Sequence, residues 1–262
     1  MIRALYTAAS GMNAQQANID TVANNLANVN TAGFKKSRME FQDLVYQQLV
    51  APGSQTSTSS EAPVGLEVGL GTRAAATARD FANGNLRATN GPLDLAIEGR
   101  GFFQVSMPNG ETAYTRSGAL HLSAEGNLVT ADGFSIEPQI TIPENAISVT
   151  VSKTGIVSVQ IAGQTATQEV GTIELAAFQN PAGLRALGGN MFATTTASGE
   201  PTTGVPGEDG IGTIVQGFLE DSNVSVVEEM VNMILAQRAY EANSKVVRAS
   251  DEMLTQVNNL VR

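Results

Sequence analysis

Two long heptad patterns, one at each end of this 262-residue chain, constrain its fold more than any other feature. At the N-terminus, apolar and small residues follow one another in steps of three and four from Ile2 to Leu26, and Gly33 offers a stop with a left-handed backbone. At the C-terminus, Ser225 and Glu228 form a capping box ahead of a second long pattern. Both ends are therefore predicted to be helical.

The C-terminal helix, predicted over about 225–260 and roughly 54 Å long, carries two apolar stripes. One stripe runs from Val231 to Leu260 and the other from Val226 to Val261. A single partner helix would leave one of these stripes in water. Because the rest of the chain offers few other helices, we expect both ends to pack in an assembly of several copies. An ordinary helix buried in a globular core is the alternative.

The N-terminal pattern ends in an amide-rich stretch, NNLANVNTAGF at residues 24–34. Asparagine is a poor helix former, and Asp20 is the only charged residue between Ala4 and Phe34. An unpaired buried charge is costly, whereas an amide both donates and accepts hydrogen bonds and can fix the register of packed helices. We therefore predict an assembly protein whose two ends come together and polymerise. The predicted self-assembly residues are Leu5, Met12, Ile19, Asn24, Asn25, Leu26, Asn28, Val29, Met230, Leu235, Tyr240, Val246, Met253 and Leu260.

Between the helical ends the hydrophobic period changes to two, which is typical of half-buried strands. The runs FFQVSM, ALHL, ISVTV and IVSVQI alternate in this way, and turn sequences such as Asn109-Gly110 separate them. Stretches rich in Gly, Pro, Ser and Thr at 51–63 and 195–212 flank the strands. The predicted fold class is α+β, with discontinuous terminal helices that pair as a coiled-coil-like assembly domain. The predicted domains are 1–45 with 221–262 for helical assembly, 46–84 with 201–220 as extended connectors, and 85–200 as an antiparallel β domain.

The net charge of −10 is concentrated in the middle of the chain. Residues 1–46 carry four basic and three acidic groups, residues 47–220 carry seven and sixteen, and residues 221–262 carry four and six. An acidic chain without a basic stripe argues against nucleic-acid binding. The absence of cysteine excludes disulfides and thiolate metal sites. No apolar run approaches the ~18 residues of a membrane span, and the start of the chain lacks the apolar core of a cleaved secretory signal.

Candidate catalytic residues are few, and each has a plainer structural explanation. His121 lies between two leucines of an alternating run and has no second His or Cys for a metal site. The glycine-rich GRGFF at 99–103 precedes a strand, whereas phosphate loops precede helices, so we predict a bulge or tight turn there. Carboxylate pairs such as Asp94 with Glu98 leave a secreted β-fold glycosidase of the cell wall as the rival hypothesis. We expect no catalytic residue, no metal and no cofactor, and hence no enzyme.

Four stretches of the chain carry a resemblance to a known family, and the two longest lie near its ends. They are SGMNAQQANIDTVANNLANVNTAGFKKSR at 10–38 and SNVSVVEEMVNMILAQRAYEANSKVVRASDEML at 222–254. Together with the shorter IEGRGFFQV at 97–105 and GNLVTADGF at 126–134, they resemble the signatures of the flagellar basal-body rod and hook family. Residues that depart from the family's usual pattern are Ser117, Leu120 and Ser123, which affects local surface detail. The resemblance implies a structural axial protein of a helical tube, with terminal helices in an inner layer and a β domain outside.

Within this family, YQQLVAPGSQTSTSSEAPVGLEVGLGTR at 46–73 resembles the segment that marks distal-rod subunits and that typical hook subunits lack. The resemblance implies a rigid tube, or drive shaft, that crosses the periplasm and transmits torque from the motor to the hook. It also implies contacts with copies of itself, with the adjoining proximal rod and hook proteins and with surrounding ring (bushing) proteins, and export by the flagellar type III apparatus without a cleaved signal peptide. A proximal rod or hook protein of the same family is the alternative. We assign rigidity to residues 46–63, anchored by Tyr46, Leu49, Val50, Pro52, Pro63, Val64 and Leu66.

Overall fold

The computed structural model describes residues 2–57, 60–61, 63–162 and 166–260, and the chain forms two compact units. Unit 1 consists of Met1–Ala27, Ser37–Ala78 and Ser225–Arg262, and unit 2 consists of Asn28–Lys36 and Arg79–Val224. The sequence-based division treats 46–84 and 201–220 as connectors. In the structure, most of the first connector belongs with the terminal helices and the whole of the second belongs with the β unit.

Unit 1 contains the two long helices, α1 (Ile2–Ala27) and α2 (Val226–Leu260). The predicted helices at both ends and the β-rich region between them are thereby confirmed. Gly33 does not end α1 directly, but adopts a φ of 72° in the segment that follows the helix. A Cβ on Gly33 would lie within 3.0 Å of backbone atoms of Arg116 and Ser117, so the close approach of two segments requires a glycine here.

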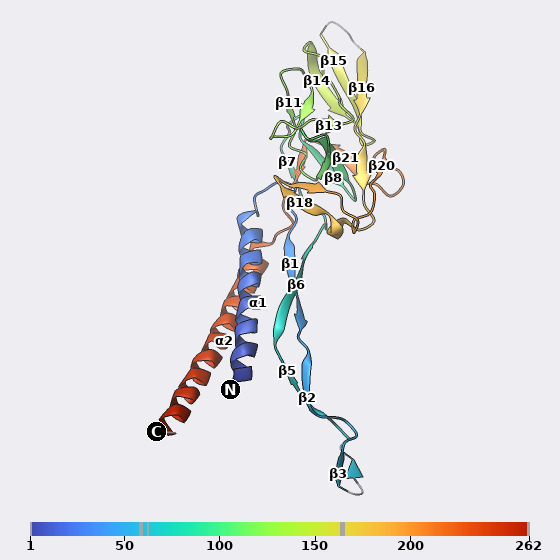
Figure 1. Ribbon diagram of the computed structural model, residues 1–262. Helices are drawn as coiled ribbons and strands as arrows, with labels where there is room; N and C mark the ends of the chain where they lie inside the picture. The colour runs from blue at the N-terminus through green and yellow to red at the C-terminus, as the bar shows by residue number, and fades with distance from the viewer. Residues whose placement is uncertain (1, 58–59, 62, 163–165, 261–262) are drawn as a thin grey trace. The chain divides into compact units, whose positions relative to one another are not determined.

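The rest of unit 1 is a long two-stranded ribbon (Figure 1). Its strand pairs are β1 (Ser37–Asp43) with β6 (Thr72–Arg79), β2 (Tyr46–Val50) with β5 (Leu66–Gly69), and β3 (Gln55–Ser57) with β4 (Ser60–Glu61). β2 and β5 run antiparallel, with Tyr46 opposite Gly69 and Val50 opposite Leu66. Each strand of the ribbon therefore pairs along one edge with its neighbour, and its other edge points away from the pair.

Unit 2 is built from short strands, and its largest sheet has the order β18-β19-β10-β9-β17-β20, with β13 also paired to β9. These strands are β9 (Phe102–Ser106), β10 (Thr112–Thr115), β13 (Ile136–Glu137), β17 (Leu175–Ala177), β18 (Arg185–Gly188), β19 (Met191–Ala193) and β20 (Thr202–Gly204). A second sheet has the order β14-β15-β16, and three further pairs are β7 with β22, β8 with β21, and β11 with β12. All these neighbours run antiparallel.

The bounds of the remaining elements of unit 2 are β7 (Leu86–Ala88), β8 (Leu95–Glu98), β11 (His121–Leu122), β12 (Leu128–Val129), β14 (Ala146–Val151), β15 (Ile156–Ile161), β16 (Thr167–Thr172), the 3-10 helix η1 (Pro181–Gly183), β21 (Thr213–Gln216) and β22 (Phe218–Glu220). The alternating runs recognised in the sequence correspond to β9, β11, β14 and β15. Period-two patterning therefore located these strands, although β9 buries side chains on both of its faces and both residues of β11 are exposed.

Two hydrophobic clusters form the core of unit 2, and β9 contributes to both. Phe103 is fully buried in the larger cluster, which also holds Leu175 and Val157. Its neighbour Phe102 belongs to the second cluster, where it packs edge-to-face on Phe178 at 5.6 Å between ring centroids. Successive side chains of a strand point to opposite faces, so the Phe-Phe pair joins the two clusters through one strand.

Candidate assembly surface

The helices α1 and α2 lie side by side and run antiparallel (Figure 1). Two contacts define their register. Asn25 donates from Nδ2 to Glu229 Oε2 at 3.3 Å, and a Cβ on Gly11 would lie 2.7 Å from Asn243 Nδ2. The same number of residues separates these two points on each helix. The buried seam is lined largely by small residues, which allow close packing: Ala8, Ala14, Ala236 and Ser250.

The apolar side chains of α2 that the sequence pattern singles out lie mostly on the other faces of the helix, in solvent. Leu235 is 61% exposed, Met230 is 52% exposed and Val231 is 50% exposed. Further exposed apolar residues of α2 are Val226, Val227, Ile234, Tyr240, Val246, Met253 and Val257. The predicted contact residue Leu260 lies outside the described side chains. Proteins that remain single in solution rarely expose so long an apolar surface, so α2 presents a surface suited to another chain.

The interface residues predicted near the N-terminus are only partly covered within the chain. The half-buried ones are Leu5, Met12, Ile19, Leu26, Asn28 and Val29, whereas Asn24 is exposed. Each half-buried apolar side chain keeps part of its surface available to a second partner. The predicted α1 stripe is thus neither an internal core nor a fully solvated face.

Asn25 corrects one expectation, because its amide is used inside the chain and not between chains. The side chain is 2% exposed. Its Nδ2 donates to Ser37 O at 2.8 Å, and its Oδ1 accepts from Ser37 N at 2.9 Å. With the bond to Glu229, Asn25 joins α1 to the start of β1 and to the first turn of α2. The carboxylate of Glu229 is well placed there, since the N-terminal end of a helix favours negative charge.

The capping box predicted at the start of α2 is present only in weak form. The Glu228 N–H donates to Ser225 Oγ at 3.5 Å, which is long for a hydrogen bond, whereas the Glu229 N–H donates to Ser225 O at 3.0 Å. The helix therefore begins where the motif places it, but with backbone bonding as the firmer contact.

The residues assigned to rod stiffening lie on the ribbon of unit 1 with their side chains largely in solvent. Val64 is 78% exposed and Leu66 is 54% exposed. The others, also exposed, are Tyr46, Leu49, Val50, Pro52 and Pro63. The backbones of β2 and β5 bond to each other along one edge of each strand, so the ribbon presents these side chains and its outer strand edges to a neighbouring subunit.

A buried ion cluster in unit 2 escapes sequence reasoning, because its members are far apart along the chain. Glu220 accepts from Lys35 Nζ at 2.6 Å and from Arg116 Nε at 2.6 Å, and all three side chains are almost completely buried. Burial lowers the pKa of Lys35, and the nearby carboxylate of Glu220 offsets this only in part. Burial alone would raise the pKa of Glu220, but the charges of Arg116 and Lys35 outweigh it and hold that pKa below its ordinary value.

The glycine-rich loop at 99–101 forms the other half of this cluster. Arg116 donates to the carbonyl oxygens of Gly101 at 2.7 Å, Gly99 at 2.6 Å and Ile97 at 3.0 Å. Gly99 and Gly101 have φ of 110° and 147°, which turns these carbonyls toward the guanidinium. The loop therefore holds a cation with carbonyls, which is the reverse of a phosphate loop that presents N–H groups.

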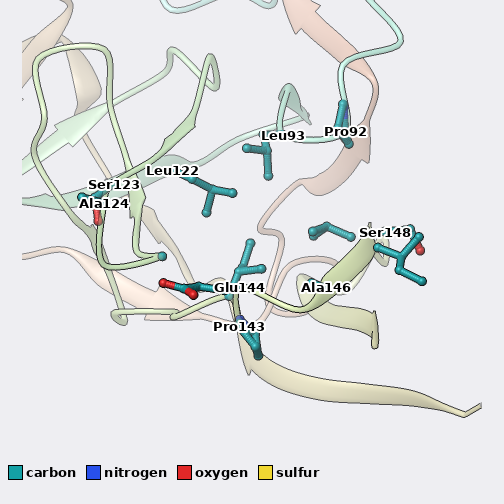
Figure 2. A pocket seen from close by; sticks show the side chains of 13 residues that line it. Pro92, Leu93, Leu122, Ser123, Ala124, Pro143, Glu144, Ala146 and Ser148 are labelled. Atoms are coloured by element: carbon teal, nitrogen blue, oxygen red, sulfur yellow. The ribbon is translucent and has the colours of Figure 1, made fainter. Parts of the chain in front are cut away.

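An open pocket of about 460 Å³ in unit 2 is bordered by the 92–93 segment, the 122–126 turn and the start of β14 (Figure 2). Leu93 and Leu122 project into it, and Glu144 lies on its rim. Among the described residues that line it, Glu144 is the one ionisable side chain. Hydrolysis of a glycosidic bond ordinarily requires two carboxyl groups flanking the bond, so this pocket does not favour the glycosidase hypothesis.

The remaining candidate residues have local structural partners. His121 is exposed on β11, and Asp94 accepts a hydrogen bond from Thr89 Oγ1 at 2.5 Å. None of the helices in the described part of the chain combines the length and apolarity needed to cross a membrane.

Comparison with known proteins identifies three matching families. They are described as "Flagella basal body rod protein" over residues 5–35, "Flagellar hook protein FlgE/F/G D1 domain" over residues 96–159, and "Flagellar basal body rod FlgEFG protein C-terminal" over residues 215–260. The flagellar basal-body rod protein FlgG of Borreliella burgdorferi is 51% identical over 264 residues, which cover 100% of both chains. FlgG of Caulobacter vibrioides is 48% identical over 260 residues, which cover 99% of both chains. The solved hook protein FlgE2 of Helicobacter pylori gives a TM-score of 0.25 at 14% identity over 71% of this chain and 43% of its own, too little to carry an inference.

Proposed function

The chain belongs to the FlgG family of flagellar basal-body rod proteins, and we propose that it polymerises as a structural subunit of the distal rod into a rigid helical tube. This tube would serve as the drive shaft between motor and hook. The observation that carries the proposal is the exposed apolar surface of α2, since Leu235 and its neighbours need a covering that the single chain does not provide.

The assembly proceeds in two layers of contact. Within a chain, α1 and α2 pair through a seam of small residues and through the Asn25–Glu229 bond. Between chains, coiled-coil-like packing covers the stripe that contains Leu235 on α2, together with the half-buried residues of α1 such as Leu26. The face of α2 that packs on α1 is then covered within the chain, and the exposed residues of its two apolar stripes are covered by other chains.

The ribbon is proposed to supply stiffness. A hook must bend as it turns, so its subunits must slide past one another, whereas a rod must not. The exposed apolar side chains of the ribbon, such as Val64 and Leu66, would hold an adjacent subunit in one position. Deleting residues 47–63 is expected to leave a tube that assembles through its helices but is curved or more flexible.

A matched variant separates the side chains from the length of the ribbon. The double substitution Val64→Ser with Leu66→Ser keeps the strand pairing of β5 but removes the apolar contacts. Filament curvature measured by electron microscopy decides the matter. Straight, stiff filaments from both variants would show that the ribbon has no part in rigidity.

The basal body of the flagellum is the location that this family membership indicates. The proposed partners are further copies of the chain, the adjoining proximal rod and hook proteins, the surrounding ring proteins and the type III export apparatus. Its net charge of −10 and lack of a basic stripe give no support to nucleic acid as a partner.

Purified protein tests the proposal directly. Filaments seen by electron microscopy, with no release of sugar from cell-wall material, are expected. Hydrolysis lost on substitution of a single carboxylate would instead establish the glycosidase. Placing the chain by cryo-electron microscopy in an isolated basal body separates the distal rod from the alternatives, a proximal rod or a hook position.

A further inference from the structure

Three segments of unit 2 carry every covalent passage of the chain between the two units. The chain enters unit 2 at residue 28 and leaves it after residue 36. It enters unit 2 again at Arg79 and leaves it after Val224. Any force that travels along the backbone between the units therefore passes through residues 28–36, 79–84 or 220–224. These three are called the joining segments below.

Backbone and amide hydrogen bonds tie the joining segments to one another. The Asp80 N–H donates to Lys36 O at 2.9 Å, which connects the first two segments. Asn223 connects all three, because its Oδ1 accepts from the Lys36 N–H at 2.8 Å and its Nδ2 donates to Asp80 O at 2.9 Å. The Gly33 N–H donates to Glu220 O at 2.8 Å.

The carboxylate of Glu220 joins the same segments to the sheet of unit 2. Its Oε1 accepts from Lys35 Nζ at 2.6 Å and from the Gly84 N–H at 2.8 Å, so one oxygen holds both other segments. Its Oε2 accepts from Arg116. Arg116 follows β10 and is held in turn by the carbonyls that precede β9.

We infer that Glu220 is the positioning residue that fastens the three joining segments to the sheet of unit 2 as one cooperative element. The consequence of this fastening for the rod rests on the proposed function. In a rotating rod, torque would enter unit 2 through the three joining segments together. Under load, a segment held alone would lose its hydrogen bonds one at a time. Segments that are joined at one carboxylate divide the load among them.

A fastening role and a general stabilising role predict different patterns of hydrogen exchange in the full-length chain. In Glu220→Gln, the amides of Gly33, Lys36, Asp80 and Gly84 should lose protection by roughly ten- to a hundredfold, the effect of losing a hydrogen bond to a buried charge. The Ile173 amide, which donates to Gly155 O in the second sheet, should keep its protection. Equal loss at all these amides, or loss at none, would overturn the inference.

Two further variants make the result specific. Asp221→Asn removes the neighbouring carboxylate, whose 2.9 Å pair with Arg87 is largely exposed, and should leave the four amides protected. Asn223→Ala keeps every charge of the cluster and should expose the Lys36 N–H to exchange while the Gly33 N–H stays protected. This variant also tests the inference if Glu220→Gln does not fold. Loss of protection at Gly33 in Asn223→Ala equal to that at Lys36 would contradict the assigned role of Glu220. Because exchange is measured on the single chain, failure of the parent to form filaments would refute the proposed rod function and leave this result standing.

Discussion

Leu235→Ala should weaken polymerisation while leaving the single chain folded. Leu235 is 61% exposed, so it contributes little to the stability of an isolated chain. Full burial of a leucine side chain is worth about 1.5–3 kcal/mol, and covering the exposed share on assembly is therefore worth about 1–2 kcal/mol per copy. Since 1.4 kcal/mol is about tenfold in an equilibrium constant, the protein concentration needed for filament growth should rise roughly five- to thirtyfold.

Sedimentation of filaments over a concentration series measures this shift, and thermal unfolding of the dilute chain measures its own stability. The matched control is Leu175→Ala, which truncates a fully buried leucine in the larger core cluster of unit 2. That variant should lose about 2–5 kcal/mol of unfolding free energy. If Leu235→Ala lowered the melting temperature of the single chain as much as Leu175→Ala, with filaments unaffected, Leu235 would belong to an internal core and the reasoning would fail.

Three further predictions concern the contacts within the chain. Asn25→Leu should keep α1 helical, since leucine is the better helix former, but it leaves Ser37 and Glu229 without their partner at a cost of about 1–3 kcal/mol each; circular dichroism and urea unfolding report the two effects, and an unchanged midpoint would contradict the structure. Gly11→Val should push Asn243 aside and loosen the helix pair, so fluorescence energy transfer between labels on α1 and α2 should decrease. Ala23→Val adds the same side chain at an exposed position of α1 and should not change it. The pKa of Glu220 is lower in the folded chain than in the unfolded one, so its stabilisation is present above the unfolded pKa and is lost as pH falls through the folded pKa; urea unfolding at a series of acidic pH values should show a flatter pH dependence for Glu220→Gln than for the parent, and parallel curves would exclude this role.

The two helices and several strands could be predicted from the sequence because the residue patterns that indicate them lie within each element. Period-two alternation located β9, β14 and β15, and heptad spacing located α1 and α2. The face of α2 that packs on α1 was not accessible, because it includes Glu229, Asn243 and Ser250 and so lacks an apolar pattern. Small residues and hydrogen bonds form this seam, and neither stands out in a hydrophobicity count.

The buried cluster was inaccessible for a different reason. Lys35, Arg116 and Glu220 meet only after the chain has closed on itself, and each resembles an ordinary surface charge in its own stretch of sequence. Lys35 even stands beside Lys36, which gives no sign that one of the two is buried. The pairing of the ribbon strands could not be predicted for a related reason. The composition of residues 51–63 indicates how much entropy a free segment loses on ordering, but it does not show which strands pair at the ends of that segment.

The bond from Asn223 Nδ2 to Asp80 O places the beginning and the end of the long segment of unit 2 at the same point. An insertion whose two ends are adjacent can be exchanged for another compact domain without stretching the host. Unit 1 is thus a host whose long inserted segment begins and ends at one point. Grafting a small reporter domain with adjacent termini between Arg79 and Val224 would turn the filament into a periodic display scaffold, provided that residues 28–36 are redesigned, because Gly33 and Lys35 lose Glu220 as their partner.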